Sequence, residues 1–73
     1  MFDWQGLEVF VAAARVENFS AAAQELHLSQ PAVTQRIQAL ERDMGVSLFE
    51  RQGRRVFLSE AGAYLLPMAQ DLI

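Results

Sequence analysis

Two predicted helices, over residues 19–26 and 30–44, are separated by only three residues, which limits how far apart they can lie. Asn18 and Ser29 each precede one of the helices, and their side chains can accept a hydrogen bond from a free backbone N–H as N-caps. Pro31 follows in the first turn of the second helix, where the missing N–H of proline costs nothing. A short link between two helices is typical of a helix-turn-helix unit.

A further amphipathic helix is predicted before this pair, over residues 3–15. Its apolar stripe has helical spacing and consists of Leu7, Phe10, Val11 and Ala14. The 73 residues suffice for one domain, and a hydrophobic content of 52% is too high for a disordered tail. A chain of this length builds only a small core, which favours a compact helical fold.

The pattern changes after Gly45, a residue suited to ending the helix before it. Residues 48–51 and 55–58 are two strand-like runs, and Gly53 between them can adopt the positive φ of a hairpin turn. A last helix is predicted from Ser59 onward. The sequence therefore predicts a mainly α fold of the winged helix-turn-helix type, with three helices, a β-hairpin wing and a C-terminal linker helix. The expected division is a domain over residues 1–58 and the start of a linker helix over 59–73.

Charge is unevenly distributed along the chain. The net charge is −3 and the pI is about 4.9, which argues against binding nucleic acid through overall charge. Residues 29–55, however, carry five arginines against three carboxylates, a net of +2. Because phosphate contact depends on local charge, this central segment is a candidate for DNA contact.

The helix over residues 30–44 has one apolar and one polar face. Its predicted core stripe is Val33, Ile37 and Leu40. At about 100° per residue, the side chains directed away from this stripe are Pro31, Gln35, Gln38 and Arg42, with Thr34 on the flank. Glutamine can bind adenine through two hydrogen bonds, and threonine offers a hydroxyl and a methyl group. A helix face exposed to water has the same polarity, so this face alone leaves both interpretations open.

Arginines also gather near the predicted hairpin turn, at positions 51, 54 and 55. Arginine at the end of a β-wing can reach a minor groove, whose narrow form attracts guanidinium groups. An isolated hairpin with these residues would be interpreted as a solvated turn. Beside a candidate recognition helix, the same residues favour DNA contact.

Several blocks of the sequence resemble the N-terminal domain of LysR-type transcription regulators. Residues 10–14 (FVAAA), 18–26 (NFSAAAQEL) and 28–41 (LSQPAVTQRIQALE) resemble the family's helix-turn-helix. The wing and the start of the linker helix are matched by 45–51 (GVSLFER) and 58–62 (LSEAG), so the resemblance covers about residues 2–73. Two departures are Glu17-Asn18, where the family usually has Gly-Ser, and Thr34, where serine is commoner.

The resemblance implies a transcription regulator that binds pseudo-palindromic double-stranded DNA as a homodimer or a higher homo-oligomer. In that family the helix matching residues 30–44 enters the major groove, and wing arginines reach phosphates or the minor groove. Together with the charge and face patterns, this predicts a DNA interface formed by Ser29, Gln30, Pro31, Thr34, Gln35, Arg36, Gln38, Arg51, Arg54 and Arg55.

The last helix is expected to carry the dimer contact of the intact protein. Its predicted apolar face consists of Leu65, Leu66, Ala69, Leu72 and Ile73. Pro67 removes one backbone hydrogen bond and is expected to bend the helix or divide it. The alternative is that this face covers the first helix. In the family this helix leads to an effector domain, so a small-molecule effector is expected only through a C-terminal domain that this sequence lacks.

Other chemistry finds little support in the sequence. There is no cysteine, and the single histidine, His27, has no cluster of carboxylates around it, so neither a metal nor a cofactor is expected. We expect a cytoplasmic protein that is not an enzyme and has no membrane span. A winged-helix module that binds another protein is the main alternative, favoured by the acidic pI. A small-molecule sensor is disfavoured because the chain lacks room for a pocket beside its core.

Overall fold

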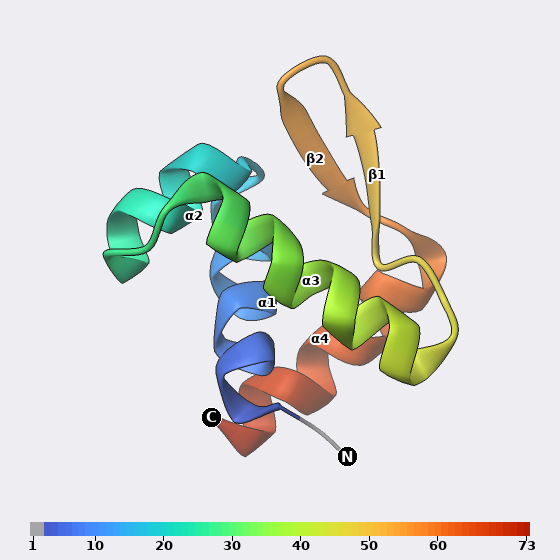
Figure 1. The fold of residues 1–73 in the computed structure, drawn as a ribbon. Coiled ribbons are helices and arrows are strands. Elements are labelled where there is room, and N and C mark those ends of the chain that lie inside the picture. The colour runs from blue at the N-terminus through green and yellow to red at the C-terminus, as the bar shows by residue number, and fades with distance from the viewer. Residues whose placement is uncertain (1–2) are drawn as a thin grey trace.

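Helices dominate the computed structural model, which describes residues 3–73 (Figure 1). The elements, in chain order, are α1 (Trp4–Val16), α2 (Phe19–Leu26), α3 (Gln30–Met44), β1 (Phe49–Gln52), β2 (Arg55–Leu58) and α4 (Glu60–Leu72). The mainly α winged helix-turn-helix fold is confirmed, and α2 and α3 have the predicted bounds. Strand β1 begins one residue later than predicted. The first two residues of the predicted 1–58 domain lie outside the described residues.

Every helix begins at a side-chain cap. The side chains of Asn18 and Ser29 accept hydrogen bonds from the backbone N–H groups three residues later, at 2.8 and 3.1 Å. Ser59 caps α4 in the same manner, at 3.0 Å, and Asp3 caps α1 by accepting from the backbone N–H of Gln5, two residues later, at 3.2 Å. These local bonds satisfy backbone donors that have no partner inside the helix, which is why the predicted helix starts agree with the structure.

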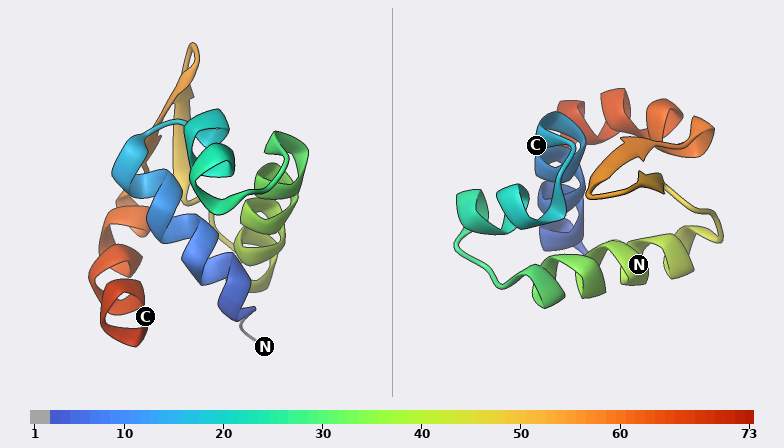
Figure 2. Two further views of the ribbon diagram at one scale, coloured as in Figure 1. Left: turned by 90° about the vertical axis from the view of Figure 1, so that its left-hand side faces the viewer. Right: turned by 90° about the horizontal axis from the view of Figure 1, so that it is seen from above.

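Helix α1 runs through the middle of the molecule, with α3 and α4 on opposite sides of it (Figure 2). Phe10 on α1 is fully buried, and its ring centroid lies 5.5 Å from that of Phe49 at the start of the hairpin. Helix α3 contributes the predicted stripe of Val33, Ile37 and Leu40 to the same core. The position of α3 is therefore determined by burial of one face against α1 and α2.

The hairpin projects beyond the helices as a wing (Figure 2). Gln52 pairs with Arg55, so Gly53 and Arg54 form a two-residue turn. Gly53 has the predicted positive φ, 61°, whereas Arg54 is not among the residues with positive φ, which is the pattern of a type II′ turn.

The base of the wing is held by polar contacts. The backbone N–H of Leu48 donates to the Glu41 carboxylate at 2.8 Å, and the backbone N–H of Ser59 donates to the Leu48 carbonyl at 2.9 Å. Gly62 lies directly against that carbonyl, where a β-carbon would collide with the oxygen. The small size of Gly62 thus allows α4 to approach the wing closely.

The packing of α4 differs from part of the predicted dimer face. Leu65 and Ala69 belong to the core of the domain itself, because α4 packs against α1, and this burial leaves them no surface for a second subunit. Leu66 is half-buried, while Leu72 and Ile73 are exposed. The helix is also continuous across Pro67, so the predicted division does not occur. Proline leaves one carbonyl in the preceding turn without its partner, but the buried contacts on both sides hold the helix together.

No helix within residues 3–73 combines the length and apolar character that crossing a membrane requires.

Candidate nucleic-acid interface

The outward face of α3 is formed by uncharged polar side chains. Gln30, Gln35 and Gln38 are exposed, as is Pro31, and Thr34 is half-buried on the flank, in agreement with the predicted orientation. The Gln30 side-chain amide donates a hydrogen bond to the Thr34 hydroxyl at 3.0 Å. Two of the predicted base-contacting residues are thus connected to each other within α3.

Arg36 lies apart from this group. Its guanidinium donates to the Asp3 carboxylate at 3.1 Å and its side chain is partly buried. The same carboxylate caps α1, so Arg36 connects α3 to the start of α1. Its predicted role at the DNA interface stays a prediction, but its charge is balanced by Asp3 within the domain.

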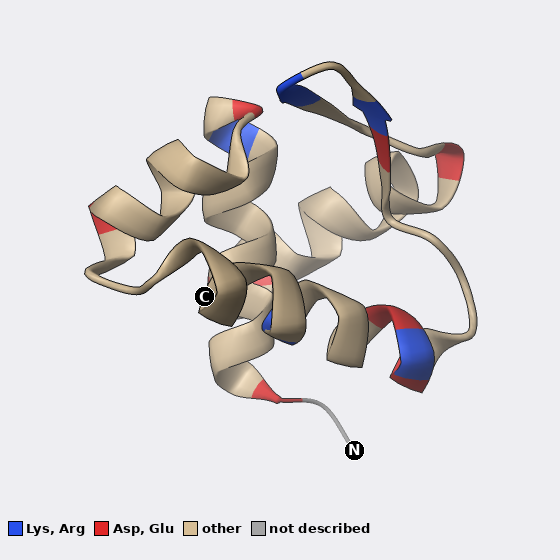
Figure 3. Cartoon of the chain, turned by 45° about the horizontal axis from the view of Figure 1, so that its top comes forward, with Lys and Arg blue, Asp and Glu red and all other residues tan. Residues whose placement is uncertain are grey.

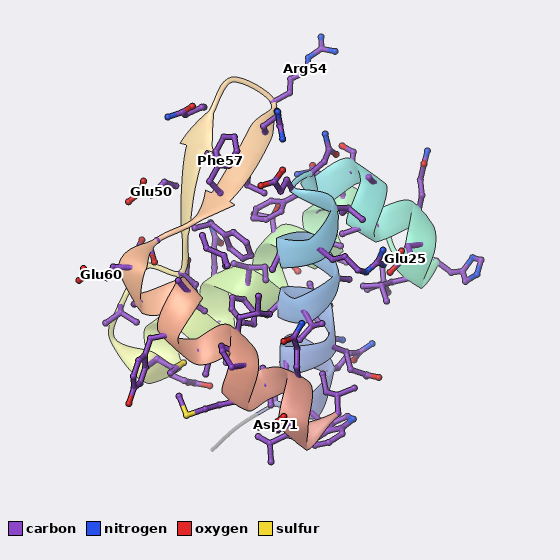
Figure 4. All side chains as sticks on the ribbon, turned by 180° about the vertical axis from the view of Figure 1, so that it is seen from behind. Glu25, Glu50, Arg54, Phe57, Glu60 and Asp71 are labelled. Carbon is purple, nitrogen blue, oxygen red and sulfur yellow. The ribbon has the colours of Figure 1, made fainter. Side chains whose placement is uncertain are left out.

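The wing brings three arginines close to its tip (Figure 3). Arg54 extends beyond the tip into solvent (Figure 4). Arg51 lies over the Phe19 ring with 5.0 Å between its guanidinium carbon and the ring centroid, so it is held by a cation–π contact that leaves its N–H donors available. Arg55 is paired with the Glu17 carboxylate at 2.5 Å.

A surface pocket of about 470 Å³ lies between the wing and the start of α2. Its lining consists of Asn18, Phe19, Ser20, Gln30, Arg51, Gly53, Arg54 and Val56. The free N–H groups in the first turn of α2 carry partial positive charge, and two arginines face the same space. The combination suits an anion such as a backbone phosphate. The wing arginines and the Asn18 cap were predictable separately from the sequence, whereas Ser20 and the pocket that they share were not. The cap signal at Asn18 was the one local indication of this location.

The remaining ion pair lies away from this surface. Arg15 on α1 and Glu25 on α2 are paired, and the hydrogen bond and opposite charge of Glu25 raise the pKa of Arg15 above its usual value. Among the described residues, the three recorded ion pairs thus engage Arg15, Arg36 and Arg55. Arg51 and Arg54 are the wing cations outside these pairs.

A helix pair with an exposed, uncharged polar face, next to an arginine-bearing hairpin, defines a winged helix-turn-helix domain. Over residues 4–63 the sequence matches the model for bacterial regulatory helix-turn-helix proteins of the lysR family. The chain belongs to this family.

Relatives and solved structures agree with this assignment. The HTH-type transcriptional regulator TfdT of Cupriavidus pinatubonensis is 51% identical over 67 residues, which is 92% of this chain and 29% of that regulator. The CbnR_DBD–DNA complex superposes with a TM-score of 0.93 at 42% identity, over 97% of this chain and 82% of that one. For the BenM_DBD/catB site 1 DNA complex the TM-score is 0.91 at 32% identity, over 97% and 76%. The chain spans about half or less of the length of the curated relatives it matches.

Proposed function

We propose that this chain binds double-stranded DNA sequence-specifically, as the DNA-binding domain of a LysR-type transcriptional regulator. The observation that carries the proposal is the arrangement of the α3 face beside the arginine-lined pocket of the wing. Two similar structures, of CbnR and BenM domains, are complexes with DNA, which supports the same role here. From this role we infer that the protein is a cytoplasmic regulator and not an enzyme.

In this proposal α3 enters the major groove and reads base edges. Gln30, Thr34, Gln35 and Gln38 supply hydrogen-bonding groups, and Pro31 supplies apolar contact. Ser29 lies at the start of the helix, where backbone N–H groups meet phosphate. Arg51 and Arg54 contact phosphates or the minor groove from the wing, and Arg36 and Arg55 can join them by exchanging their carboxylate partners for phosphate.

Fluorescence anisotropy with a random duplex at low salt tests the proposal. We expect binding whose affinity falls steeply as salt rises, because arginines displace counterions from phosphate. The slope of log affinity against log salt should be roughly −3 to −6 per subunit pair. Absence of binding at low salt would instead favour a winged-helix module that binds another protein, the alternative that the acidic pI of about 4.9 supports.

We further propose that the intact protein is a homodimer or a higher homo-oligomer paired through the exposed side of α4. Tyr64, Met68, Leu72 and Ile73 are exposed apolar residues on or at the end of this helix. Because α4 and α3 lie on opposite sides of α1, pairing through α4 leaves α3 free for DNA (Figure 2). A small-molecule effector would bind a further domain, in the part of the relatives that this chain does not cover.

Sedimentation at several concentrations tests the α4 contact. Leu72 is 56% exposed, so Leu72→Glu should reduce association with little effect on the unfolding temperature. Gln70→Glu introduces the same side chain at an exposed polar position of α4 and should leave association unchanged. Equal association in all three proteins would show that this side of α4 is not the dimer contact.

A further inference from the structure

Glu17 occupies a backbone position that is unusual for a residue with a side chain. It ends α1 with φ 56° and ψ 34°, in the left-handed region that favours glycine. His27 ends α2 with almost the same φ, 58°, and no ion pair is recorded for it among the described residues. Capping a helix at such a position therefore does not require a carboxylate, and the side chain of Glu17 needs a separate explanation.

Both the backbone and the side chain of Glu17 contact the wing. The Glu17 carbonyl accepts a hydrogen bond from the backbone N–H of Val56 at 3.1 Å. The Glu17 carboxylate accepts one from the Arg55 guanidinium at 2.5 Å. The Arg55 guanidinium also lies 5.0 Å from the centroid of the Phe57 ring. Two successive residues of β2 are thus tied to the end of α1, and Arg55 is held on the side of the wing that faces α1.

The pairing changes the charge that the wing presents to DNA. Of the three wing arginines, Arg51 keeps its donors free over the Phe19 ring and Arg54 extends into solvent, whereas Arg55 is neutralised. Glu17 directly precedes Asn18, which lines the candidate phosphate pocket, and its carboxylate holds Arg55, which is not among the residues that line the pocket. The Glu17 side chain is 40% exposed and that of Arg55 is 62% exposed, so the pair can open and exchange in water.

We propose that Glu17 is a positioning residue that competes with DNA phosphate for Arg55. The carboxylate holds the guanidinium against α1, so that in the unchanged chain Arg55 contacts phosphate only in the small fraction of complexes in which the pair has opened. Glu17 thereby weakens contact with any DNA backbone, whereas base reading by α3 is unaffected. The competition raises the share of binding energy that depends on sequence. This inference rests on the proposed DNA-binding function.

The test compares Glu17→Gln with Glu25→Gln, each measured by anisotropy with a random duplex over a range of salt concentrations. Both changes remove one negative charge from an exposed pair with arginine, since the Arg15 and Glu25 side chains are 58% and 43% exposed. We expect Glu17→Gln to bind more tightly at 50 mM salt and to steepen the salt slope by about 1 per subunit. Its advantage over the unchanged chain should shrink by about 3-fold between 50 and 200 mM salt. Glu25→Gln should behave as the unchanged chain.

A second pair of variants separates release of Arg55 from general repulsion. In an Arg55→Gln background, adding Glu17→Gln should no longer steepen the slope, because no guanidinium is left to release. The inference would be overturned if Glu17→Gln still steepened the salt slope fully in the Arg55→Gln background. It would also be overturned if Glu25→Gln steepened the slope equally, or if Glu17→Gln alone left the slope unchanged. Thermal unfolding confirms that each variant is folded. If the unchanged chain bound no duplex, the proposed function would fall as well, so the two failures are distinguishable.

Discussion

Helix α3 and the wing are held in place in different ways. Helix α3 buries Val33, Ile37 and Leu40 almost completely, and its exposed side chains between residues 30 and 38 are all uncharged. The wing buries Leu48 at its base and Val56, the second residue of β2, but all of residues 50–55 are exposed. Its position depends on packing of Phe49 against Phe10 and Phe19. A few polar contacts, from Glu41, Ser59 and Glu17, add to this packing.

The difference indicates a division of tasks. Reading bases requires side chains held within a narrow range of positions, and close packing of the opposite face supplies this rigidity. Contact with phosphates tolerates movement, because charge attraction depends weakly on orientation. Changes in the α3 core should therefore affect the whole fold, while changes at the base of the wing should affect DNA binding more than stability.

The largest expected effect is that of Leu40→Ala. Leu40 is 1% exposed, and removing a buried leucine leaves a cavity that destabilises a domain by about 2–5 kcal/mol. Denaturant unfolding followed by circular dichroism measures the loss. Leu72→Ala removes the same atoms from an exposed site and should change stability little. Equal losses in the two variants would contradict the claim that burial holds α3.

Gly62→Ala should act on the wing. A β-carbon at Gly62 would collide with the Leu48 carbonyl and lie 2.9 Å from the Leu58 side chain, so the hairpin base must shift. Overpacking of this kind destabilises by about 1–3 kcal/mol, and we expect a clear loss of DNA affinity in the folded variant.

Gly6→Ala is the matched control for Gly62→Ala, because a β-carbon there meets nothing closer than 3.5 Å. Alanine favours a helix over glycine, so Gly6→Ala should be neutral or stabilising. If Gly62→Ala unfolded the domain as completely as Leu40→Ala, the wing and α3 would form one inseparable unit and the comparison would fail.

The two regions should also differ in how they affect sequence preference. Gln35→Ala or Thr34→Ala should relax the preferred site, with a loss of about 1–3 kcal/mol for each base contact. Arg51→Ala or Arg54→Ala should weaken binding to all sequences more evenly. Selection from randomised duplexes followed by affinity measurement distinguishes these outcomes. A preferred site that stays the same in both α3 variants would show that the base-reading face lies elsewhere.

The smallest expected effects concern two serine caps. Ser29→Ala and Ser59→Ala each remove an N-cap, which typically destabilises by about 1 kcal/mol. Ser59 also donates to the Ser47 carbonyl at 2.6 Å, so its replacement should cause the larger drop in unfolding temperature. A larger drop for Ser29→Ala would indicate that the start of α3 depends on its cap more than on its packing.

Much of the secondary structure was predictable because its signals are local. Asn18, Ser29 and Ser59 cap their helices as predicted, and Gly45 and Gly53 have the positive φ values that end a helix and form a turn. The orientation of the α3 face also followed from helical periodicity. Each of these features depends on neighbouring residues, which the sequence specifies directly.

Periodicity was a poorer guide to the predicted dimer face on α4. An amphipathic stripe shows that a face is apolar, but it does not show which surface covers it. From the sequence, Leu65 and Ala69 therefore looked available to a second subunit, but in the structure they are buried where α4 packs against α1.

The predicted division at residue 58 is not tested by this packing and stays a prediction.

The sequence by itself determined the helices, the hairpin, the polar recognition face and the gathering of arginines near the wing. Only the tertiary structure decided which arginines of the central segment are paired with a carboxylate, because the Arg36–Asp3 and Arg55–Glu17 pairs join residues that lie 33 and 38 positions apart. Charge is a property of composition, but its availability depends on which opposite charge the fold brings within a few ångströms.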